Sequence, residues 1–408
     1  CAGHLIEAAI AVHRATGDRR LLDGMERYAD LIRRVFGPEE GQIPGYPGHE
    51  ELELALVKLY RHSSKRKWLD LAAYFIEVRG GRPHYFDLEA RQRGEDPGTY
   101  WAGTHAYTQS HRPVREQDAV VGHAVRAMYL YSGMADLAAE TGDTALLQTL
   151  QRLWEDLTRH KLYLTGGIGP SRENEGFMGN YDLPNEAYAE TCAAIGLIFW
   201  AQRMLQLDLD SRYADVMERA FYNGFLSGVS LSGDRFFYEN PLASDGDHHR
   251  QPFYACSCCP PNVNRLLPAV GEYLYSVGPR EIDVHLYVQS RARVDLEGGP
   301  LTLVQETDYP WDGVVCFSFE MDAPRTFTLK LRWPGWCREG WIYLNGEPVA
   351  TEGKIERGYV VLPGEWHPGD RLRLQWSMPA GLVYPHPQIQ ADLGQAAVMR
   401  GPLVYCLE

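Results

Sequence analysis

The chain has 408 residues, of which 45% are hydrophobic and 23% are charged, and its formal net charge at pH 7 is −14. Because a single hydrophobic core stops growing at roughly 250–300 residues, this length predicts two domains. The acidic balance offers no basic field to a nucleic acid or an anionic membrane, so we expect neither as a partner.

The first part of the chain repeats a pattern of amphipathic helix, polar turn and amphipathic helix. The turns are ATGDRRLLD, RHSSKRKWLDLA, ETGDTALLQ and QLDLDSRYADVMERA, at 15–23, 61–72, 140–148 and 206–220. Gly typically ends a helix and Asp or Ser caps the next one, which predicts αα-hairpins. Each helix has one apolar stripe and must stack on its neighbours. The irregular spacing and the long loops favour a closed α/α toroid over residues 1–275, with its loops at one mouth.

After about residue 275 the pattern changes to short runs with alternating or β-branched residues, such as VHLYVQSRARVDL, GVVCFSFEM and RLRLQWSM. Turns rich in Gly, Pro and Asn separate these runs, which predicts an antiparallel β-sandwich over residues 276–408. No low-complexity linker separates the halves, so we expect the two domains to pack closely.

The first residues have the pattern of a helix already under way and the last residues that of a strand, so we expect both domains to be incomplete, at the N-terminus and the C-terminus respectively. The eight cysteines cluster once and otherwise scatter, unlike a secreted disulfide framework, which favours a reducing, cytoplasmic location.

Three of the cysteines lie together in the segment CSCCPPN. An isolated pair such as Cys258 and Cys259 is most simply two small buried hydrophobic residues or a vicinal disulfide. The E-x-C of Glu190 and Cys192 changes that interpretation, because zinc takes four ligands from thiolate, imidazole and carboxylate groups. We predict a Zn²⁺ site formed by Glu190, Cys192, Cys258 and Cys259, with Cys256 as the competing ligand.

A closed site with four protein ligands is most simply structural. A metal-bound thiolate in a loop near carboxylates, however, can attack an electrophilic carbon. Glu173 and Glu175 have the pattern of a solvated surface pair, but a loop of this length could bring Glu175 beside Glu190. A glycosidase needs a proton donor for the leaving oxygen, and Glu175 suits that role, with Glu173 as the weaker candidate.

Three histidines are candidates for substrate binding. His123 and His4 occur at helical spacing, which is most simply explained by packing in the core, whereas His49 ends a loop rich in Gly and Pro. In a toroid the ends of the inner helices line the mouth, so the three could share a pocket and bind sugar hydroxyls. Tyr107 or Trp101 could stack on a sugar ring, although either could equally belong to the core.

Several segments together resemble the zinc-dependent cysteine β-L-arabinofuranosidases of glycoside hydrolase family 127, and the related family 146. They include AGHLIEAAIAVHRATGD, GYPGHEELELAL, PVREQDAVVGHAVRAMYLYSGMADLA, YDLPNEAYAETCAAIG, FYNGFLSGVSL, FFYENPLAS and CSCCPPNVNRLLPAVGEYLY, and the resemblance covers essentially the whole chain. It implies an (α/α)6 toroid followed by β-sandwich structure. It also implies a retaining, exo-acting hydrolase that releases terminal β-L-arabinofuranose.

The resemblance also implies a role for each candidate residue. Cys258 is the nucleophile, and Glu175, in the element Glu175-Gly176-Phe177, is the acid/base. Two departures concern this part of the motif: Asn precedes Glu175 where Gly is expected, and the spacing from Asn185 to Glu190 is one residue shorter. The implied zinc ligands are Glu190, Cys192, Cys258 and Cys259, and the implied sugar contacts are His4, His49 and His123.

Two alternatives stay open. The same residues could hydrolyse another furanose or a branched acidic sugar, since specificity depends on details of the pocket. The chain could instead be a non-catalytic carbohydrate-binding protein with structural zinc. In each case the expected partner is an oligosaccharide or small-molecule ligand, and a homodimer is left open.

Overall fold

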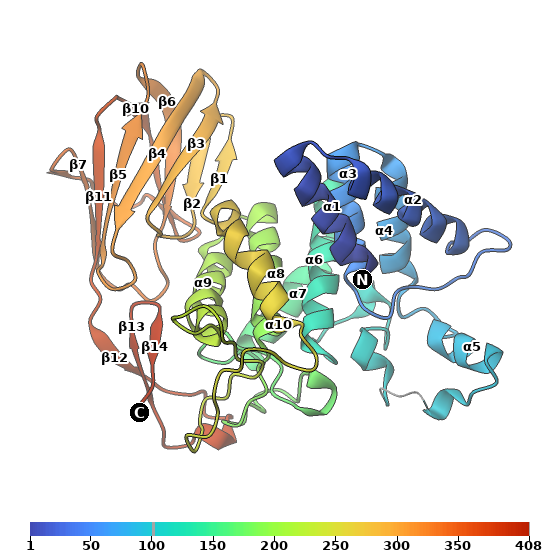
Figure 1. Ribbon diagram of the computed structural model, residues 1–408. Helices are drawn as coiled ribbons and strands as arrows, with labels where there is room; N and C mark the ends of the chain where they lie inside the picture. Colours follow the sequence, from blue (N-terminus) through green and yellow to red (C-terminus); the bar gives the residue numbers. More distant parts are fainter. Residues whose placement is uncertain (100–102, 408) are drawn as a thin grey trace.

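The computed structural model describes residues 1–99 and 103–407; Trp101, one of the two candidates for sugar stacking, lies outside this range. A helical body and a β body lie side by side (Figure 1). The α-helices are α1 (Ala2–Thr16), α2 (Arg20–Val35), α3 (Leu52–Ser63), α4 (Arg66–Val78), α5 (Tyr85–Gln92), α6 (Ala124–Thr141), α7 (Thr144–His160), α8 (Thr191–Leu207), α9 (Ser211–Arg219) and α10 (Cys259–Leu266).

The predicted αα-hairpins are confirmed as α1/α2, α3/α4, α6/α7 and α8/α9. The expected turn chemistry is complete at the third hairpin, whereas the first has the expected glycine but Arg19 as the N-cap of α2, without a side-chain hydrogen bond. Gly17 and Gly142 end α1 and α6 in the left-handed conformation, with φ of 75° and 68°. Asp143 then caps α7 by accepting a hydrogen bond from the backbone of Leu146. The residues in these turns therefore determine where each helix stops and the next begins.

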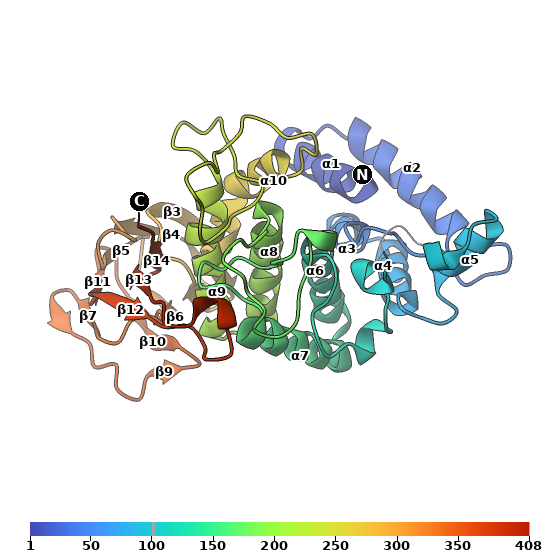
Figure 2. The same cartoon turned by 90° about the horizontal axis from the view of Figure 1, so that it is seen from below.

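Helices α1, α3, α6, α8 and α10 contact one another in that order and form an inner layer, with α2, α4, α7 and α9 outside it (Figure 2). The inner helices α6 and α8 are buried on nearly all sides, as an inner layer requires. Arg265 of α10 forms an ion pair with Glu7 of α1, so the ends of this arc meet through charged side chains. The described helices do not by themselves establish a closed six-hairpin ring.

The inner helices enter the fold from the same end (Figure 1), and the first residues of four of them, α1, α6, α8 and α10, include candidates from the sequence, whereas Glu51 at α3 was not one. Glu51 is the N-cap of α3, His123 of α6, Glu190 of α8 and Cys258 of α10. His4 lies in the first turn of α1. Stacking the hairpins therefore gathers residues far apart in the sequence at one mouth.

The β body contains two sheets that share one hydrophobic core. One sheet has the order β1 (Tyr275–Gly278), β2 (Glu281–Val284), β6 (Arg325–Arg332), β10 (Tyr359–Trp366), β9 (Ile355–Glu356). The other has the order β3 (Ser290–Leu296), β4 (Gly299–Thr307), β5 (Val314–Glu320), β11 (Arg371–Trp376), β7 (Gly340–Leu344), β8 (Glu347–Pro348). This agrees with the predicted sandwich.

The prediction of purely antiparallel pairing is wrong at one place. Strands β2 and β6 are parallel, with Ile282 opposite Leu329. The chain leaves the first sheet after β2, builds β3, β4 and β5 in the second, and returns as β6, and such a crossover permits parallel neighbours.

A third sheet, which the sequence pattern did not separate from the sandwich, contains β12 (Ala380–Val383), β13 (Ala397–Arg400) and β14 (Leu403–Tyr405). It contacts both bodies: Arg400 of β13 donates to the carbonyl of Trp311 in the sandwich at 2.8 Å, and Asn223 of the helical body holds the turn and strand that follow. The side chain of Asn223 donates to the carbonyl of Pro402 at 2.9 Å and accepts from the backbone N–H of Val404 at 2.9 Å.

Buried charges join the helical body to the sandwich, as the expected close packing requires. Arg332 of β6 is fully buried and forms ion pairs with Asp215, at 2.6 Å, and Glu218 of α9. The hydroxyl of Tyr309 donates to Glu218 at 2.7 Å. These carboxylates are removed from water on folding, so the guanidinium of Arg332 is needed to balance them.

Candidate functional site

Three sulfur atoms and one carboxylate gather where α8 and α10 begin. The Sγ of Cys258 lies 3.3 Å from Oε1 of Glu190 and 3.8 Å from the Sγ of Cys259, which in turn lies 3.5 Å from the Sγ of Cys192. One ligand atom from each of the four residues lies within 4.8 Å of every other. The four candidates therefore form one cluster, and the 3.8 Å spacing excludes a vicinal disulfide between Cys258 and Cys259.

This cluster fits a metal ion by the chemistry of its donors. Thiolate sulfur and carboxylate oxygen are ligands that zinc prefers, in a set of four. Glu190 is 3% exposed, and its Oε2 is buried without a hydrogen-bond partner. A buried carboxylate oxygen without a partner is destabilising by itself, and a divalent cation among these donors would offset that. Cys256, the competing ligand in the sequence, is exposed and lies outside the group of four.

Cys258 differs electrostatically from the other two cysteines of the cluster. Hydrogen bonds with Cys192 and Cys259, and then with Tyr238 and Glu190, lower the pKa of the Cys258 thiol to about 2 against the opposing effect of burial. Hydrogen bonds to Cys258 and Cys259, together with burial, raise the pKa of Cys192 well above its usual value. These hydrogen bonds favour the thiolate form at Cys258 over Cys192, and Cys258 also lies at the start of a helix, where the backbone dipole favours a thiolate.

Glu175 reaches this cluster from a loop whose backbone is held in place. Asn174 and Glu175 have φ of 58° and 48°, in the left-handed region that few residues other than Gly adopt. Gly176 follows, and the backbone N–H of Phe177 donates to the carbonyl of Gly122 at 2.9 Å. A Cβ on Gly176 would lie 2.4 Å from that same carbonyl oxygen, so a side chain has no room there. The loop is thereby fastened directly beside His123.

The carboxylate of Glu175 lies between a histidine and a tyrosine. Its Oε2 is 3.4 Å from Nε2 of His123 and 3.4 Å from the hydroxyl of Tyr238. The Nδ1 of His123 accepts from the backbone N–H of Val125 at 3.2 Å, so Nε2 carries the proton and donates to Glu175. This hydrogen bond lowers the pKa of Glu175. Glu173, the weaker acid/base candidate, is exposed on the same loop.

The other two candidate histidines lie against Tyr129 of α6. The rings of His49 and His4 have centroids 5.7 Å and 6.4 Å from that of Tyr129. The hydroxyl of Tyr129 accepts from the side chain of Asn262 in α10 at 2.9 Å, which ties this group to the helix that begins with the cysteines. Both histidine side chains are solvent-accessible yet closely surrounded.

The surroundings of His49 and His4 keep both rings neutral near pH 7. Burial, followed by the charge of Arg126, lowers the pKa of His49 to about 2. Burial, followed by the charge of Arg265, lowers the pKa of His4 to about 4. A neutral imidazole has one donor and one acceptor, which matches the hydrogen-bonding capacity of a sugar hydroxyl.

Tyr238 is a site residue that the sequence analysis missed. Its hydroxyl lies 3.4 Å from the Sγ of Cys258, 3.4 Å from Oε2 of Glu175 and 4.0 Å from the Sγ of Cys256. The segment FFYENPLAS that contains Tyr238 has no residue spacing typical of a site. Only the folding of this loop back onto the starts of α8 and α10 brings Tyr238 to Cys258. Tyr107, a candidate for stacking, is buried with its ring 5.3 Å from that of His123, so it contributes to the wall behind the site.

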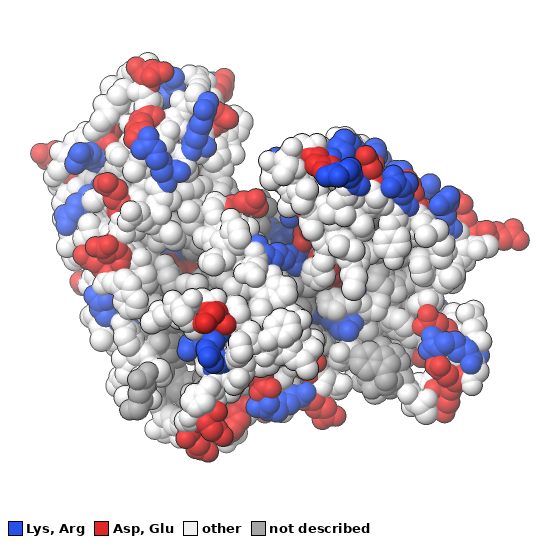
Figure 3. All heavy atoms as spheres, viewed as in Figure 1, with Lys and Arg blue, Asp and Glu red and all other residues white. Residues whose placement is uncertain are grey.

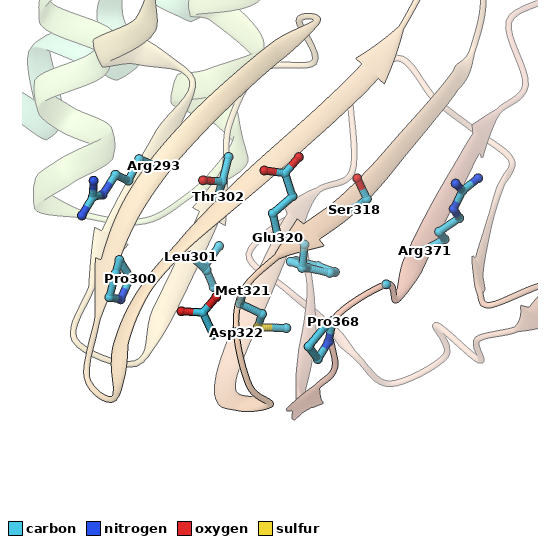
Figure 4. Close-up of a pocket in the computed structure, with 12 residues that line it drawn as sticks. Arg293, Pro300, Leu301, Thr302, Ser318, Glu320, Met321, Asp322, Pro368 and Arg371 are labelled. Carbon is cyan, nitrogen blue, oxygen red and sulfur yellow. The ribbon is translucent and has the colours of Figure 1, made fainter.

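A depression of about 660 Å³ lies elsewhere, on the β-sandwich, and is shown in Figure 4. Arg293 and Arg371 lie on opposite sides of it, with Glu320 and Ser318 between them. Its described lining contains neither cysteine nor histidine, so it lacks the groups that the cysteine cluster offers for chemistry.

On the face shown in Figure 3, acidic and basic side chains are interspersed over most of the surface. Basic groups gather mainly over α2, where five arginines occur within residues 19–34. Within the described part of the chain, none of the helices combines the length and apolar character that crossing a bilayer requires.

Comparison with known proteins gives consistent matches along the chain. Models of the β-L-arabinofuranosidase GH127 catalytic domain, the GH127 middle domain and the family 127 C-terminal domain match residues 1–272, 281–378 and 380–408. A non-reducing end β-L-arabinofuranosidase of Bifidobacterium longum subsp. longum is 37% identical over all of this chain and 64% of its own length.

Solved structures agree with these matches. A GH127 β-L-arabinofuranosidase from Geobacillus stearothermophilus has a TM-score of 0.97 and 49% identity, over 100% of this chain and 66% of its own. A second GH127 β-arabinofuranosidase has a TM-score of 0.91 and 39% identity, over 99% and 63%. The chain thus spans a little under two thirds of the length of these relatives.

Proposed function

The chain belongs to glycoside hydrolase family 127, and we propose from this premise that it is a retaining, exo-acting hydrolase of terminal β-L-arabinofuranose. The observation that carries the proposal is the position of the Tyr238 hydroxyl, which lies 3.4 Å from both the Sγ of Cys258 and Oε2 of Glu175. The sulfur and the carboxylate oxygen are therefore separated by no more than twice that distance. This limit of about 6.8 Å contains the separation of about 5–5.5 Å that retaining glycosidases use, and it excludes most of the range of about 6.5–9.5 Å that inverting ones use.

In the first step the sulfur of Cys258 attacks the anomeric carbon, and Glu175 donates a proton to the leaving oxygen. In the second step Glu175, now a base, takes a proton from water, which displaces the sulfur and releases the sugar with retained configuration. His123 donates to Glu175, and Tyr238 lies next to both reacting groups, so these two hold the reacting atoms in position. The lowered pKa of Cys258 supports its role as the nucleophile.

We propose that Glu190, Cys192, Cys258 and Cys259 hold zinc, as their donor types and mutual distances of less than 4.8 Å support. Zinc bound there would keep its sulfur ligands deprotonated near neutral pH and fix their orientation. His4 and His49 are proposed to bind hydroxyls of the sugar ring, which their neutral state and their access to solvent support.

We also propose that the arc of inner helices belongs to an (α/α)6 toroid. The ion pair of Arg265 with Glu7 supports this, because it draws α10 toward α1. The domain boundaries, a cytoplasmic location and a homodimer stay predictions.

Two substitutions test the mechanism, with p-nitrophenyl β-L-arabinofuranoside as the substrate and the zinc content measured by mass spectrometry. We expect Cys258→Ser to abolish turnover while some zinc stays bound, because three other ligands are present. We expect Glu175→Gln to lose activity with zinc fully retained. Full activity in either variant, or in protein freed of zinc by a chelator, would contradict the proposal.

The same assay separates the alternatives. Binding of the sugar without release of product would indicate a carbohydrate-binding protein with structural zinc. Faster turnover of another furanoside than of the arabinofuranoside would mean that the same catalytic residues act on a different substrate.

A further inference from the structure

The depression of about 660 Å³ on the sandwich hollows the outer face of the sheet that contains β3, β4, β5 and β11 (Figure 4). Pro368 and Gly369, in the turn just before β11, complete its lining. The volume lies within the range of about 300–1,000 Å³ that is typical of small-molecule sites. The described lining shares no residue with the cysteine cluster, so the depression is separate from the candidate active site.

The polar residues of the depression form rows across neighbouring strands. Arg293 of β3 is opposite Thr302 of β4, which is in turn opposite Glu320 of β5. Two residues before Glu320, Ser318 is opposite Arg371 of β11. Residues that are opposite each other in a ladder point to the same face, and the alternate residues of these strands fill the hydrophobic core. All five side chains therefore project from the outer face of the sheet, as Figure 4 shows.

Four of these polar side chains have no partner within the described part of the chain. The guanidiniums of Arg293 and Arg371 form no ion pair there, and the hydroxyls of Thr302 and Ser318 form no hydrogen bond there. Both hydroxyls belong to half-buried residues. Thr307, farther along β4, instead donates its hydroxyl to a backbone carbonyl at 2.6 Å. The hydrogen-bonding capacity of the depression is therefore available to a ligand.

The charges that line the depression balance each other. Arg293 and Arg371 carry two positive charges, and Glu320 and Asp322 carry two negative ones. Glu320 also forms an ion pair with Arg291 of β3. A highly charged ligand of either sign would meet a like charge here, and the formal net charge of −14 disfavours a polyanion further. The lining therefore favours a ligand without net charge.

The width of the depression and its apolar edge narrow the class of ligand. Strands β4 and β5 separate β3 from β11, so Arg293 and Arg371 are on the order of 14 Å apart across the sheet. A ligand that contacts both is longer than one sugar ring. Pro300, Met321 and Pro368 add accessible apolar surface. Guanidinium donors, carboxylate acceptors, hydroxyls and apolar surface together suit a chain of sugars, which has hydroxyls and apolar C–H groups.

We propose that the depression binds a neutral oligosaccharide chain of several units, as a second carbohydrate-binding surface apart from the catalytic residues. The buried ion pairs of Arg332 hold the sandwich against the helical body. A polymer bound at the depression therefore stays on the same molecule as the catalytic residues, which raises the effective concentration of its chain ends there. This last consequence rests on the proposed function, whereas the binding itself does not.

Affinity electrophoresis tests the binding, with soluble neutral arabinan in the gel as the probe. All proteins carry Cys258→Ser, so that the probe is not degraded. The variants are the double substitution Arg293→Gln/Arg371→Gln and the single substitution Thr302→Val, which keeps a β-branched side chain in the strand. Arg338→Gln removes the charge of an exposed arginine of the sandwich outside the described lining, and it is the matched control. Melting temperatures close to that of the unaltered protein show that the variants are folded.

We expect the double variant to lower the affinity for arabinan at least fivefold and Thr302→Val to lower it about threefold, as for the loss of hydrogen bonds to a ligand. The control should leave the affinity unchanged. Calorimetric titration with methyl β-L-arabinofuranoside should give equal affinities in all variants, because a single unit cannot reach both guanidiniums. An unchanged affinity for arabinan in the double variant would overturn the proposal. Tighter binding of polygalacturonate than of arabinan would overturn the assignment of a neutral ligand.

Kinetics with Cys258 intact separate failure of this inference from failure of the proposed function. The substrates are p-nitrophenyl β-L-arabinofuranoside and arabinan that carries β-L-arabinofuranose at its chain ends. The double variant should raise KM for the polymer at least fivefold and leave kcat/KM for the nitrophenyl glycoside unchanged, because a remote contact binds the ground state and the transition state equally. Equal KM values for the polymer in the double variant and the control would overturn the role in holding the substrate. If the unaltered protein turns over neither substrate, the proposed function fails, while the electrophoresis still decides whether the depression binds a sugar chain.

Discussion

Tyr238 connects the two reacting groups through a single hydroxyl, at 3.4 Å from the Sγ of Cys258 and 3.4 Å from Oε2 of Glu175. This hydroxyl is one of the groups that lower the pKa of Cys258, after Cys192 and Cys259. At the scale of single residues, the site thus depends on groups that neither act as nucleophile nor provide a metal ligand.

Replacing Tyr238 with Phe should lower kcat/KM about 10- to 100-fold, because a hydrogen bond to a charged group contributes roughly 1.5–3 kcal/mol. The zinc content should stay unchanged, since Tyr238 is outside the group of four. Steady-state kinetics and metal analysis check both expectations. Tyr384→Phe, an exposed tyrosine after β12, serves as the control, and an equal effect of both substitutions would contradict the assigned role of Tyr238.

Gly176→Ala should lower kcat by tenfold or more, because its Cβ would lie 2.4 Å from the carbonyl oxygen of Gly122 and would displace Glu175. Misplacement of a catalytic group by about 1 Å can reduce the rate roughly 10²-fold. Gly179→Ala on the same loop is the matched control, because its Cβ would meet no atom within 4 Å. Steady-state kinetics measure kcat for both variants. An unchanged kcat in Gly176→Ala would contradict the prediction, because it would show that the loop accommodates the added methyl group without displacing Glu175.

At the scale of elements, helix starts and strand ends hold the polar groups that the packing buries. His285, directly after β2, is 3% exposed, and its Nδ1 and Nε2 lie 2.8 Å from the hydroxyls of Tyr359 and Ser276. Burial, followed by the charge of Arg332, lowers the pKa of His285 to about 3. The ring is therefore neutral in the folded protein.

The lowered pKa of His285 predicts a loss of stability in acid. The unfolded chain binds a proton at this residue below about pH 6.5, whereas the folded chain does so only near pH 3. Its contribution is therefore complete above pH 6.5, and it falls by up to about 1.4 kcal/mol for each pH unit below that value. Urea denaturation at pH 7 and pH 5 should show a smaller acid loss in His285→Gln than in the unaltered protein. If both proteins lost the same stability between pH 7 and pH 5, protonation of His285 would not contribute to the destabilisation in acid.

At the scale of the whole molecule, the helical body and the sandwich are joined by Arg332 with Asp215 and Glu218, and the third sheet is fastened through Asn223. The inner helices begin at one mouth, and α5 lies at the same end of the helical body (Figure 1).

Arg332→Met should destabilise the protein by about 3–5 kcal/mol, because it leaves the carboxylates of Asp215 and Glu218 without their partner. The double variant Arg332→Met/Glu218→Gln should recover part of this loss. Arg280→Met, which breaks an exposed pair with Glu297, should leave the stability nearly unchanged, because solvent screens exposed ion pairs. Calorimetry measures all three, and a loss for Arg332→Met no larger than for Arg280→Met would contradict the role of the buried pair.

Local patterns in the sequence were enough to predict the αα-hairpins and the two-sheet body. Gly17, Gly142 and Asp143 limit helices through their own backbone preferences and hydrogen bonds, and alternation along a strand reflects which face is buried. These effects act over a few residues, so they can be predicted from the sequence alone. The parallel pairing of β2 with β6 and the separate third sheet depend on how distant segments return, which no local pattern encodes.

The sequence by itself also determined the chemical types at the site: three thiols and a carboxylate near α8 and α10, and a glutamate in a Gly-containing loop. Only the tertiary structure brought Glu175, rather than Glu173, to His123, excluded Cys256 from the group of four, and placed Tyr238 between nucleophile and acid. The physical reason is that donor chemistry belongs to single side chains, whereas distances of 3–4 Å between site residues up to 69 positions apart are set by the packing of whole helices.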